Sequence, residues 1–372
     1  MSDNVQKQRS IDYFILITTL ILIAYGLIMV FSATYYTAAS KSMYNNDGLF
    51  FLKKQLIGAA IGGAGMLFFS RIPYQKLMKY KYIFLVAALA LLVAVLIPGL
   101  GKTTNGSSRW LDFKFFTLQP SEVAKFALII FIAATIAVNQ QRMKKFRYGI
   151  LPVLLVLLIC CGLIYLQPNF SAIVCLCIMS FVMVFVGGAS SLQLGLIAGG
   201  GIGAGALLMT TQSYRMDRIL SFVDPWQYAD TKGYQVIQSL YAIGAGGFFG
   251  RGLGNSRQKL LYLPYGESDF IFSIIVEELG FLGALVLLFL FGFLVYRGIK
   301  VAMRAPDMFG TMLATGIVTI IAVQVIINIA VVTSSIPATG VSMPFISYGS
   351  SALIIFMSMI GILLNISRQS KA

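Results

Sequence analysis

The chain has 372 residues, of which 58% are hydrophobic and 11% are charged, and its mean hydropathy is +0.85. Soluble domains carry roughly a quarter of their residues as charged side chains, so this composition excludes an ordinary soluble globular protein. A net charge of +15 would suggest a nucleic-acid partner for a soluble protein, but here the basic residues cluster in short segments between apolar runs, where they indicate membrane topology. The chain contains no histidine, which excludes imidazole catalysis and histidine-based metal sites.

Ten apolar runs predict ten transmembrane helices, and the expected fold class is an all-α polytopic membrane protein. The predicted spans are residues 11–33, 54–70, 81–98, 121–138, 148–166, 170–187, 190–210, 269–296, 309–333 and 346–366. We expect residues 1–372 to form a single membrane domain, because neither a linker nor an internal repeat interrupts the pattern. The four cysteines, Cys160, Cys161, Cys175 and Cys177, fall inside the fifth and sixth runs and are interpreted as packing residues.

The distribution of basic residues predicts the orientation of the chain. An even number of spans places both termini on one side, and the N-tail, the C-tail and three segments on that side are rich in Lys and Arg: RIPYQKLMKYK, QQRMKKFR and YRGIKVAMR. Basic segments stay in the cytoplasm, so both termini are predicted to be cytoplasmic. The remaining segments, including the long ones at 99–120 and 211–268, are then external, and loops of this length are usually functional.

The fourth predicted span begins with an ionisable pair, Glu122 and Lys125, in the sequence QPSEVAKFALIIF. A spacing of three residues places both side chains on one helix face. Two interpretations stay open: a self-neutralising pair that orders the start of the helix, with Ser121 or Glu122 serving the helix dipole, or an inward-facing pair that lines a polar cavity.

The eighth predicted span contains three acids, Asp269, Glu277 and Glu278. Asp269 and Glu277 are eight residues apart, so they are predicted to lie within about 80° of each other on the helix, and Glu278 is predicted to point nearly opposite Asp269. The two glutamates need partners from other helices or a water-filled cavity. Asp269 either caps the helix or acts as an externally reachable carboxylate, suited to a general base or a cation ligand.

The predicted external segment 211–268 is basic and rich in glycine. Its cations are Arg215, Arg218, Lys232, Arg251, Arg257 and Lys259. These side chains are suited to binding a phosphate or pyrophosphate group of a substrate. Alternatively, they attract the segment to an anionic lipid surface. The glycines between 244 and 254 are attributed to close packing and not to a nucleotide loop, because no Walker Lys–Ser/Thr pair follows them.

The stretch SSIPATGVSMPFISYGSSAL before the last span combines prolines, glycines and hydroxyl side chains. Such a stretch breaks a helix at membrane depth, where it must be surrounded by protein or line a cavity. It is either a simple bend or the wall of a headgroup site.

Four stretches of the sequence, in this order, resemble the SEDS family (shape, elongation, division and sporulation). They are NGSSRWL with LQPSEVAKFALI; LQPNFSA; GYQVIQSLYAIGAGGFFGRGLGNSRQKLLYLPYGESDFIFSIIVEELGFLGA; and IPATGVSMPFISYGSSAL. The resemblance extends over residues 11–366. MDRILSFVDPW and GLGNSRQKLLYLP are more similar to the division and sporulation branch, FtsW and SpoVE, than to the elongation branch, RodA.

The resemblance implies a membrane glycosyltransferase of the bacterial cytoplasmic membrane that polymerises lipid II into glycan strands during division or sporulation. The implied partners are lipid II, the growing glycan chain, a class B penicillin-binding protein, other division or sporulation proteins and membrane lipids, with no nucleic acid. A divalent cation, Mg²⁺ or Mn²⁺, is a further candidate to balance the pyrophosphate, although no metal-binding spacing is visible.

The family motifs also imply roles for single residues. Asp269, in DFIF, falls on the essential acid of the family and is predicted to deprotonate the acceptor. The other predicted substrate-binding or cavity residues are Glu122, Lys125, Arg109, Trp110, Arg215, Arg218, Lys259, Glu277 and Ser347. Asn169 departs from the family pattern, since many members have an acid after the preceding QP.

Two other functions remain open. A transporter that flips lipid II would also use buried charges and broken helices, but its site should lie near the membrane midplane, whereas GESDFIF lies at the outer mouth. A scaffold that only recruits division proteins would leave the buried charges unexplained.

Overall fold

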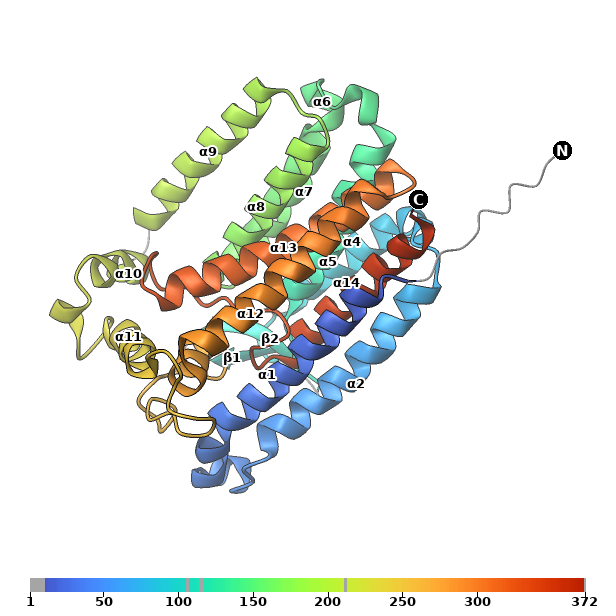
Figure 1. Cartoon of the computed structure of the whole chain (residues 1–372). Helices are drawn as coiled ribbons and strands as arrows, with labels where there is room; N and C mark the ends of the chain where they lie inside the picture. The colour runs from blue at the N-terminus through green and yellow to red at the C-terminus, as the bar shows by residue number, and fades with distance from the viewer. Residues whose placement is uncertain (1–10, 105–106, 114–116, 211–212, 371–372) are drawn as a thin grey trace.

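The computed structural model describes residues 11–104, 107–113, 117–210 and 213–370. A long helix lies at each of the ten predicted ranges, which confirms the all-α polytopic class (Figure 1). These helices are α1 (Tyr13–Ser40), α2 (Phe50–Arg71), α4 (Lys81–Ala94), α5 (Pro120–Val138), α7 (Leu151–Tyr165), α8 (Phe170–Val186), α9 (Ser191–Thr210), α12 (Ile271–Met303), α13 (Met308–Val332) and α14 (Ser350–Gln369). Two short helices, α3 (Gln75–Lys79) and α6 (Phe146–Gly149), lie in the connections.

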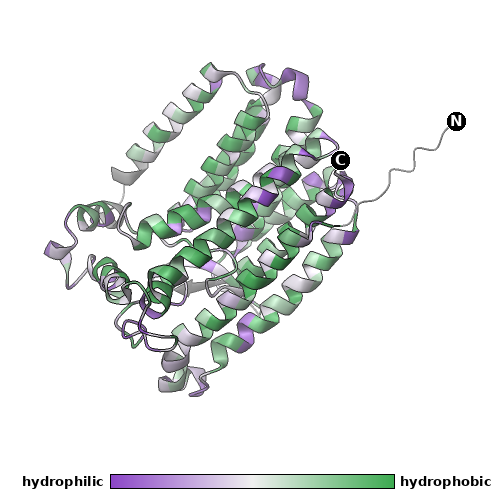
Figure 2. Ribbon diagram, viewed as in Figure 1, coloured by the Kyte–Doolittle hydropathy of each residue, from purple (hydrophilic) through white to green (hydrophobic). Residues whose placement is uncertain are grey.

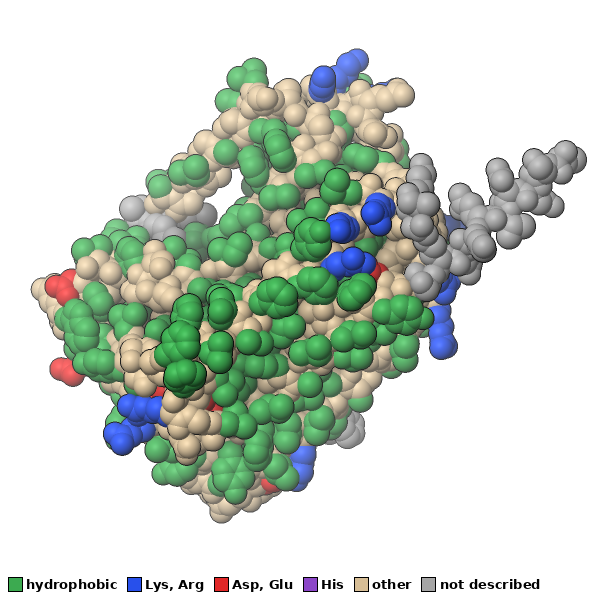
Figure 3. Space-filling model, viewed as in Figure 1, with side chains coloured by type: hydrophobic (Ala, Val, Ile, Leu, Met, Phe, Trp, Pro, Cys, Tyr) green, Lys and Arg blue, Asp and Glu red, His purple; other side chains and the backbone are tan. Residues whose placement is uncertain are grey.

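Within the described residues, five helices, α1, α5, α12, α13 and α14, are long and apolar enough to cross a membrane, and α4, α7, α8 and most of α9 are shorter apolar helices. The number of spans therefore stays a prediction. α5 and α14 are the most deeply buried of the five, whereas α12 exposes large apolar side chains such as Phe281, Leu285 and Phe289. Figure 2 shows that the long helices consist mainly of hydrophobic residues, and Figure 3 shows many hydrophobic side chains on the face in view, as expected for helices in contact with lipid.

The start of α1 and the end of α14 meet at one end of the bundle, where the backbone N–H of Asp12 donates to the hydroxyl of Ser367 at 3.1 Å (Figure 1). We call this the terminal end. An ion pair between Asp12 and Arg297 also places the last turns of α12 there. α12 consequently begins at the opposite end, which we call the distal end.

Both long segments that were predicted to be external are structured. Residues 99–120 contain a three-stranded antiparallel sheet of β1 (Gly101–Thr104), β2 (Ser107–Asp112) and β3 (Thr117–Leu118). Residues 211–268 contain α10 (Ser213–Val223) and α11 (Tyr234–Gly246). The sheet is an exception to the all-helical expectation. Pairing between the strands satisfies the backbone hydrogen-bonding groups of this connection.

α12 is kinked at Gly280, whose φ of +70° and ψ of −169° interrupt the helix. The segment that follows α11 supplies the lost hydrogen bonds: Arg251 N–H donates to the Glu277 carbonyl at 3.0 Å, and Phe281 N–H donates to the Gly247 carbonyl at 2.9 Å. A Cβ on Gly250, which has a φ of +79°, would lie 2.3 Å from the Glu278 carbonyl oxygen. This contact confirms that glycine here allows close backbone packing.

Candidate functional site

Asp269 lies at the distal end, two residues before the first residue of α12, and its side chain is partly exposed. The N-cap position belongs to Phe270, and no side chain caps the helix there. The capping interpretation of Asp269 is therefore wrong. The helical angles predicted from Asp269 to the two glutamates are also wrong, because Asp269 does not have helical geometry.

Two side chains fix the backbone around Asp269. The Nδ2 of Asn328 in α13 donates to the Asp269 carbonyl at 2.8 Å and to the Val341 carbonyl at 2.7 Å. The hydroxyl of Ser347 donates to the Ser268 carbonyl at 2.6 Å and accepts from the N–H of Met343 at 2.8 Å. The broken stretch between α13 and α14 is thus tied to the residues that carry the carboxylate, so it forms a wall of this site.

Glycine also shapes this wall. A Cβ added to Gly340 would lie 2.8 Å from Oδ2 of Asp269, so the backbone at this residue lies directly against the carboxylate. A larger residue at Gly340 would displace the Asp269 side chain.

Two arginines, one from residues 99–120 and one from residues 211–268, complete the site. Arg109, on β2, donates from Nε to the Gln167 carbonyl at 3.2 Å and from Nη2 to the Pro168 carbonyl. Arg218, on α10, donates from Nη1 to the Ala338 carbonyl at 2.9 Å. Both guanidiniums lie close enough to Asp269 to affect its protonation, although they are more than a hundred residues apart in the sequence.

Burial, and to a smaller extent the charge of Glu267, raises the pKa of the Asp269 carboxyl from its ordinary 3.8 to about 6. The guanidiniums of Arg109 and Arg218 act in the opposite direction and favour the carboxylate. Desolvation thus dominates, and a carboxyl with a pKa near 6 is ionised at neutral pH while keeping more basicity than a solvated aspartate.

The predicted pair on α5 is confirmed. Lys125 Nζ lies 2.6 Å from Oε1 of Glu122, and both side chains are about 4% exposed. The second carboxylate oxygen of Glu122 is buried and has no hydrogen-bond partner among the described residues. The neighbouring Ser121 accepts from Nδ2 of Asn169 at 3.4 Å, and Asn169 caps α8 by accepting from Ala172 N–H at 3.3 Å.

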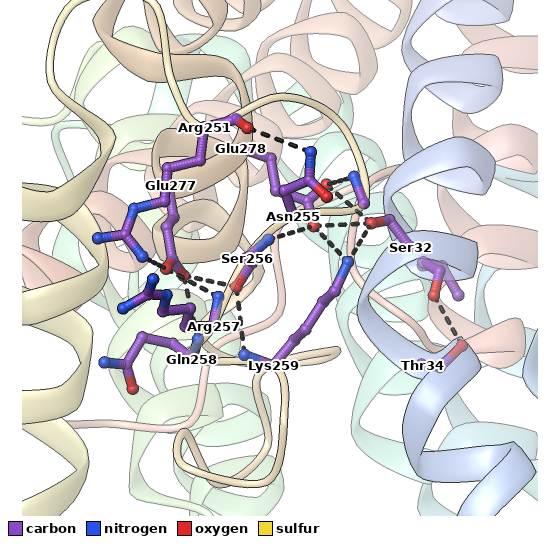
Figure 4. Close-up of polar contacts among 12 residues, drawn as sticks. Ser32, Thr34, Arg251, Asn255, Ser256, Arg257, Gln258, Lys259, Glu277 and Glu278 are labelled. Carbon is purple, nitrogen blue, oxygen red and sulfur yellow. Dashed lines mark hydrogen bonds and ion pairs between the residues drawn. The ribbon is translucent and has the colours of Figure 1, made fainter.

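Glu277 and Glu278 belong to a buried ionic network, shown in Figure 4. Glu278 accepts from Lys259 Nζ at 2.7 Å and from the hydroxyl of Ser32 in α1 at 2.7 Å. Glu277 accepts from the hydroxyl of Ser256 at 2.5 Å and pairs with Arg251 at 3.4 Å. The partners of the two acids therefore come mainly from the segment that precedes α12 in the sequence.

Six of the predicted site residues fall into two groups in the structure. It brings Asp269, Arg109, Arg218 and Ser347 together at the start of α12, while Lys259 and Glu277 belong to the network that fastens the preceding segment. Lys259 also lines a cavity of about 480 Å³ between α1 and residues 253–260. Trp110 is partly buried on β2, opposite Lys102 in the strand register, and the side chain of Arg215 lies outside the described residues.

The described residues contain no group of three His, Cys, Asp or Glu side chains that could hold a metal ion. Asp269 and Glu267 are two carboxylates near each other, which is fewer ligands than a preformed divalent-cation site needs. The described residues therefore do not fit a resident metal ion.

Sequence reasoning assigned no site role to Asn328, Gly340 or Glu267. A signal existed for Asn328, which is a lone amide in the apolar run VIINIAVV. Gly340 and Glu267 lie in connecting segments, and their importance follows only from the contact between those segments.

The whole chain is similar to known proteins. Residues 12–372 match the model of the FtsW/RodA/SpoVE family, described as cell cycle protein. Stage V sporulation protein E of Bacillus subtilis is 43% identical, with 98% of this chain and 99% of the relative covered. A probable peptidoglycan glycosyltransferase FtsW of Trichlorobacter lovleyi is also 43% identical, with 96% of this chain and 93% of the relative covered.

A solved structure has the same fold. A chain of a peptidoglycan synthase complex that coordinates polymerization and crosslinking superimposes with a TM-score of 0.76, at 26% identity, over 96% of this chain and 98% of its own length.

Proposed function

Because the chain belongs to the FtsW/RodA/SpoVE family of cell cycle proteins, we propose that it is a peptidoglycan glycosyltransferase of the bacterial cytoplasmic membrane. Its substrate is lipid II, which it polymerises into glycan strands during division or sporulation. The observation that carries the proposal is the position of Asp269: a partly exposed carboxylate, flanked by two arginines, at one end of an apolar bundle.

The reaction assigns one role to Asp269. Its carboxylate accepts the proton of the sugar 4-hydroxyl of the acceptor, the hydroxyl oxygen bonds to the anomeric carbon of the donor, and the bond from that carbon to the pyrophosphate oxygen breaks. Undecaprenyl pyrophosphate leaves with the electron pair. The raised pKa suits a general base that works near neutral pH.

Arg109 and Arg218 are assigned to the anionic substrate. Guanidinium groups bind phosphate oxygens through paired N–H donors, so they suit the pyrophosphate that carries the departing charge. Glu122 and Lys125 are buried within the bundle as a self-contained pair, and we assign them to organising α5 and not to the chemistry.

The orientation and the partner follow as parts of the same proposal. The terminal end faces the cytoplasm, so that Asp269 faces the outer leaflet, where lipid II is consumed. A class B penicillin-binding protein is the cognate partner, because the similar solved chain comes from a complex that couples polymerization to crosslinking.

The test is glycan-strand formation from labelled lipid II in proteoliposomes that also contain the class B partner. Wild type is compared with Asp269→Asn and with Asp230→Asn, a control that removes an exposed carboxylate from the segment between α10 and α11. We expect full polymerisation from the control and a loss of at least about a hundredfold in Asp269→Asn, the size expected for removal of a general base.

Two results would contradict the proposal. Equal amounts of glycan polymer from all three proteins would show that the Asp269 carboxylate is not needed for catalysis. No polymer from any of them, combined with measurable translocation of lipid II in the same vesicles, would identify a transporter.

A further inference from the structure

The terminal end of the bundle contains a hollow that the proposed reaction does not use. Its volume is about 360 Å³, and it lies between the start of α1, the last turns of α12 and the end of α14. Its lining includes Asp12, Phe14, Arg297, Lys300 and Arg304.

The hollow is strongly basic because two cations of α12 and its C-cap residue, Arg304, lie close together. Arg297, Lys300 and Arg304 follow one another at spacings of three and four residues, so they form a line along the end of α12. Asp12 is the one acid of the described lining, so three cations and one acid leave two positive charges. Figure 3 shows a group of Lys and Arg side chains on the right of the face in view, at the end of the bundle that Figure 1 marks with C.

The first of these cations is already engaged. Arg297 Nη2 lies 2.6 Å from Oδ2 of Asp12, and its guanidinium lies 4.9 Å from the centre of the Phe14 ring. Arg297 and Asp12 therefore build the floor of the hollow and join α1 to α12. Lys300, whose Nζ lies 4.5 Å from the centre of the Tyr296 ring, and the exposed Arg304 provide the charge for a ligand.

The surroundings identify the ligand as amphipathic. Large apolar side chains next to the cations are open to the outside: Tyr13 is 57% exposed, Phe14 58%, Ile299 47% and Met303 79%. A soluble anion would not use these side chains, whereas the acyl chains of a lipid would cover them. Basic hollows between transmembrane helices at a membrane face are suited to anionic headgroups.

We infer that this hollow binds the phosphodiester headgroup of an anionic phospholipid such as phosphatidylglycerol, with Lys300 and Arg304 contacting the phosphate. The bound lipid holds the junction of α1, α12 and α14 in place from the membrane side. The site is separate from Asp269, so its occupancy is measured without any assay of polymerisation.

The experiment is native mass spectrometry of the purified full-length protein in detergent, titrated with phosphatidylglycerol or phosphatidylcholine. The variant is Lys300→Gln/Arg304→Gln, and the matched control is Lys76→Gln/Lys79→Gln, which removes two exposed cations of α3 at the same end. Each basic residue near an anionic lipid is worth about fivefold in affinity, so the double variant should bind phosphatidylglycerol about 30-fold more weakly while the control is unchanged.

Folding is controlled with Lys300→Arg/Arg304→Lys, which should restore binding because the charge is kept. Equal weakening in the control, or equal binding of phosphatidylcholine by the wild type, would overturn the inference. Displacement of the bound lipid by millimolar inorganic phosphate would also overturn it, by identifying a site for free phosphate and not for a lipid.

Discussion

At the scale of single residues, the environment of Asp269 decides what its carboxylate can do. A helix cap would be stabilised as an anion by the helix dipole, and its basicity would be lowered. Asp269 lies before the cap position, and desolvation instead raises its pKa to about 6. The residue therefore keeps the basicity that proton abstraction needs.

The first prediction concerns pH. Since Asp269 acts as a base when ionised, kcat/KM for glycan polymerisation should rise about tenfold per pH unit below about pH 6 and level off above it. Initial rates with labelled lipid II from pH 5 to 8 would measure the profile. An Arg218→Gln variant should move the midpoint to higher pH, because its guanidinium lowers the pKa of Asp269. A flat profile in the wild type would contradict the assignment.

The second prediction concerns stability. A carboxyl whose pKa is higher in the folded protein than in the unfolded chain destabilises the fold once it is ionised, so stability falls as the pH rises from about 4 to about 6. Asn cannot ionise and removes this cost. Asp269→Asn should therefore unfold at the same or a higher temperature than the wild type at pH 7, by light-scattering or dye-monitored melting in detergent. A clearly lower melting temperature would show that the carboxylate is needed for folding.

At the scale of elements, the kink in α12 lies between the ionic network of Glu277 and Glu278 and the segment that packs against it, and both affect how the start of α12 is positioned beside Asp269. The segment after α11 replaces the hydrogen bonds lost at Gly280, and the same segment is fastened by Glu277 and Glu278. The first turns of α12, which follow Asp269, are therefore positioned by contacts with residues 246–259 as well as by the helix itself.

The third prediction compares two lysine–carboxylate pairs of equal length. Lys259–Glu278 and Lys53–Asp47 both measure 2.7 Å, but the lysine side chain is 7% exposed in the first and 61% in the second. Removing one partner of a buried pair leaves an unpaired buried charge and costs about 3–5 kcal/mol. An exposed pair is screened by solvent and contributes little to stability.

Lys259→Met should thus lower the free energy of unfolding by several kcal/mol, whereas Lys53→Met should change it little. Equilibrium unfolding of both variants in mixed micelles would measure the difference. Equal, small effects would show that the network in Figure 4 is not a stabilising element.

At the scale of the whole molecule, the two ends of the bundle differ in structure and in charge. The distal end carries the structured segments 99–120 and 211–268 and Asp269, and the terminal end carries basic connections, including α3 and the last turns of α12. This division gives the protein a polarity that matches a reaction on one side of a membrane.

The fourth prediction tests that polarity. After replacement of the four native cysteines by serine, Asp230→Cys should react with a membrane-impermeant maleimide added to intact cells. Lys144→Cys, in the connection between α5 and α7, should react only after the membrane is opened. The reverse labelling pattern would place the termini outside and would contradict the proposed orientation.

The sequence by itself determined the features that depend on neighbours along the chain. Apolar runs predict helices because backbone N–H and C=O groups inside a bilayer must form hydrogen bonds within the protein, which a helix provides. A long helix lies at every predicted range. The spacing of Glu122 and Lys125 predicts their pairing because residues three apart share a helix face. The DFIF motif, which resembles that of the family, identified Asp269 as a candidate catalytic residue.

Only the tertiary structure decided the rest, because it depends on contacts between residues far apart in the sequence. Asn328 and Ser347 reach Asp269 and Ser268 across 59 and 79 residues, and Lys259 reaches Ser32 across 227. The kink at Gly280 requires a second segment to supply hydrogen bonds, so no local pattern predicts it. The pKa of Asp269 likewise reflects desolvation by the surrounding segments, a property that the order of residues along one helix does not contain.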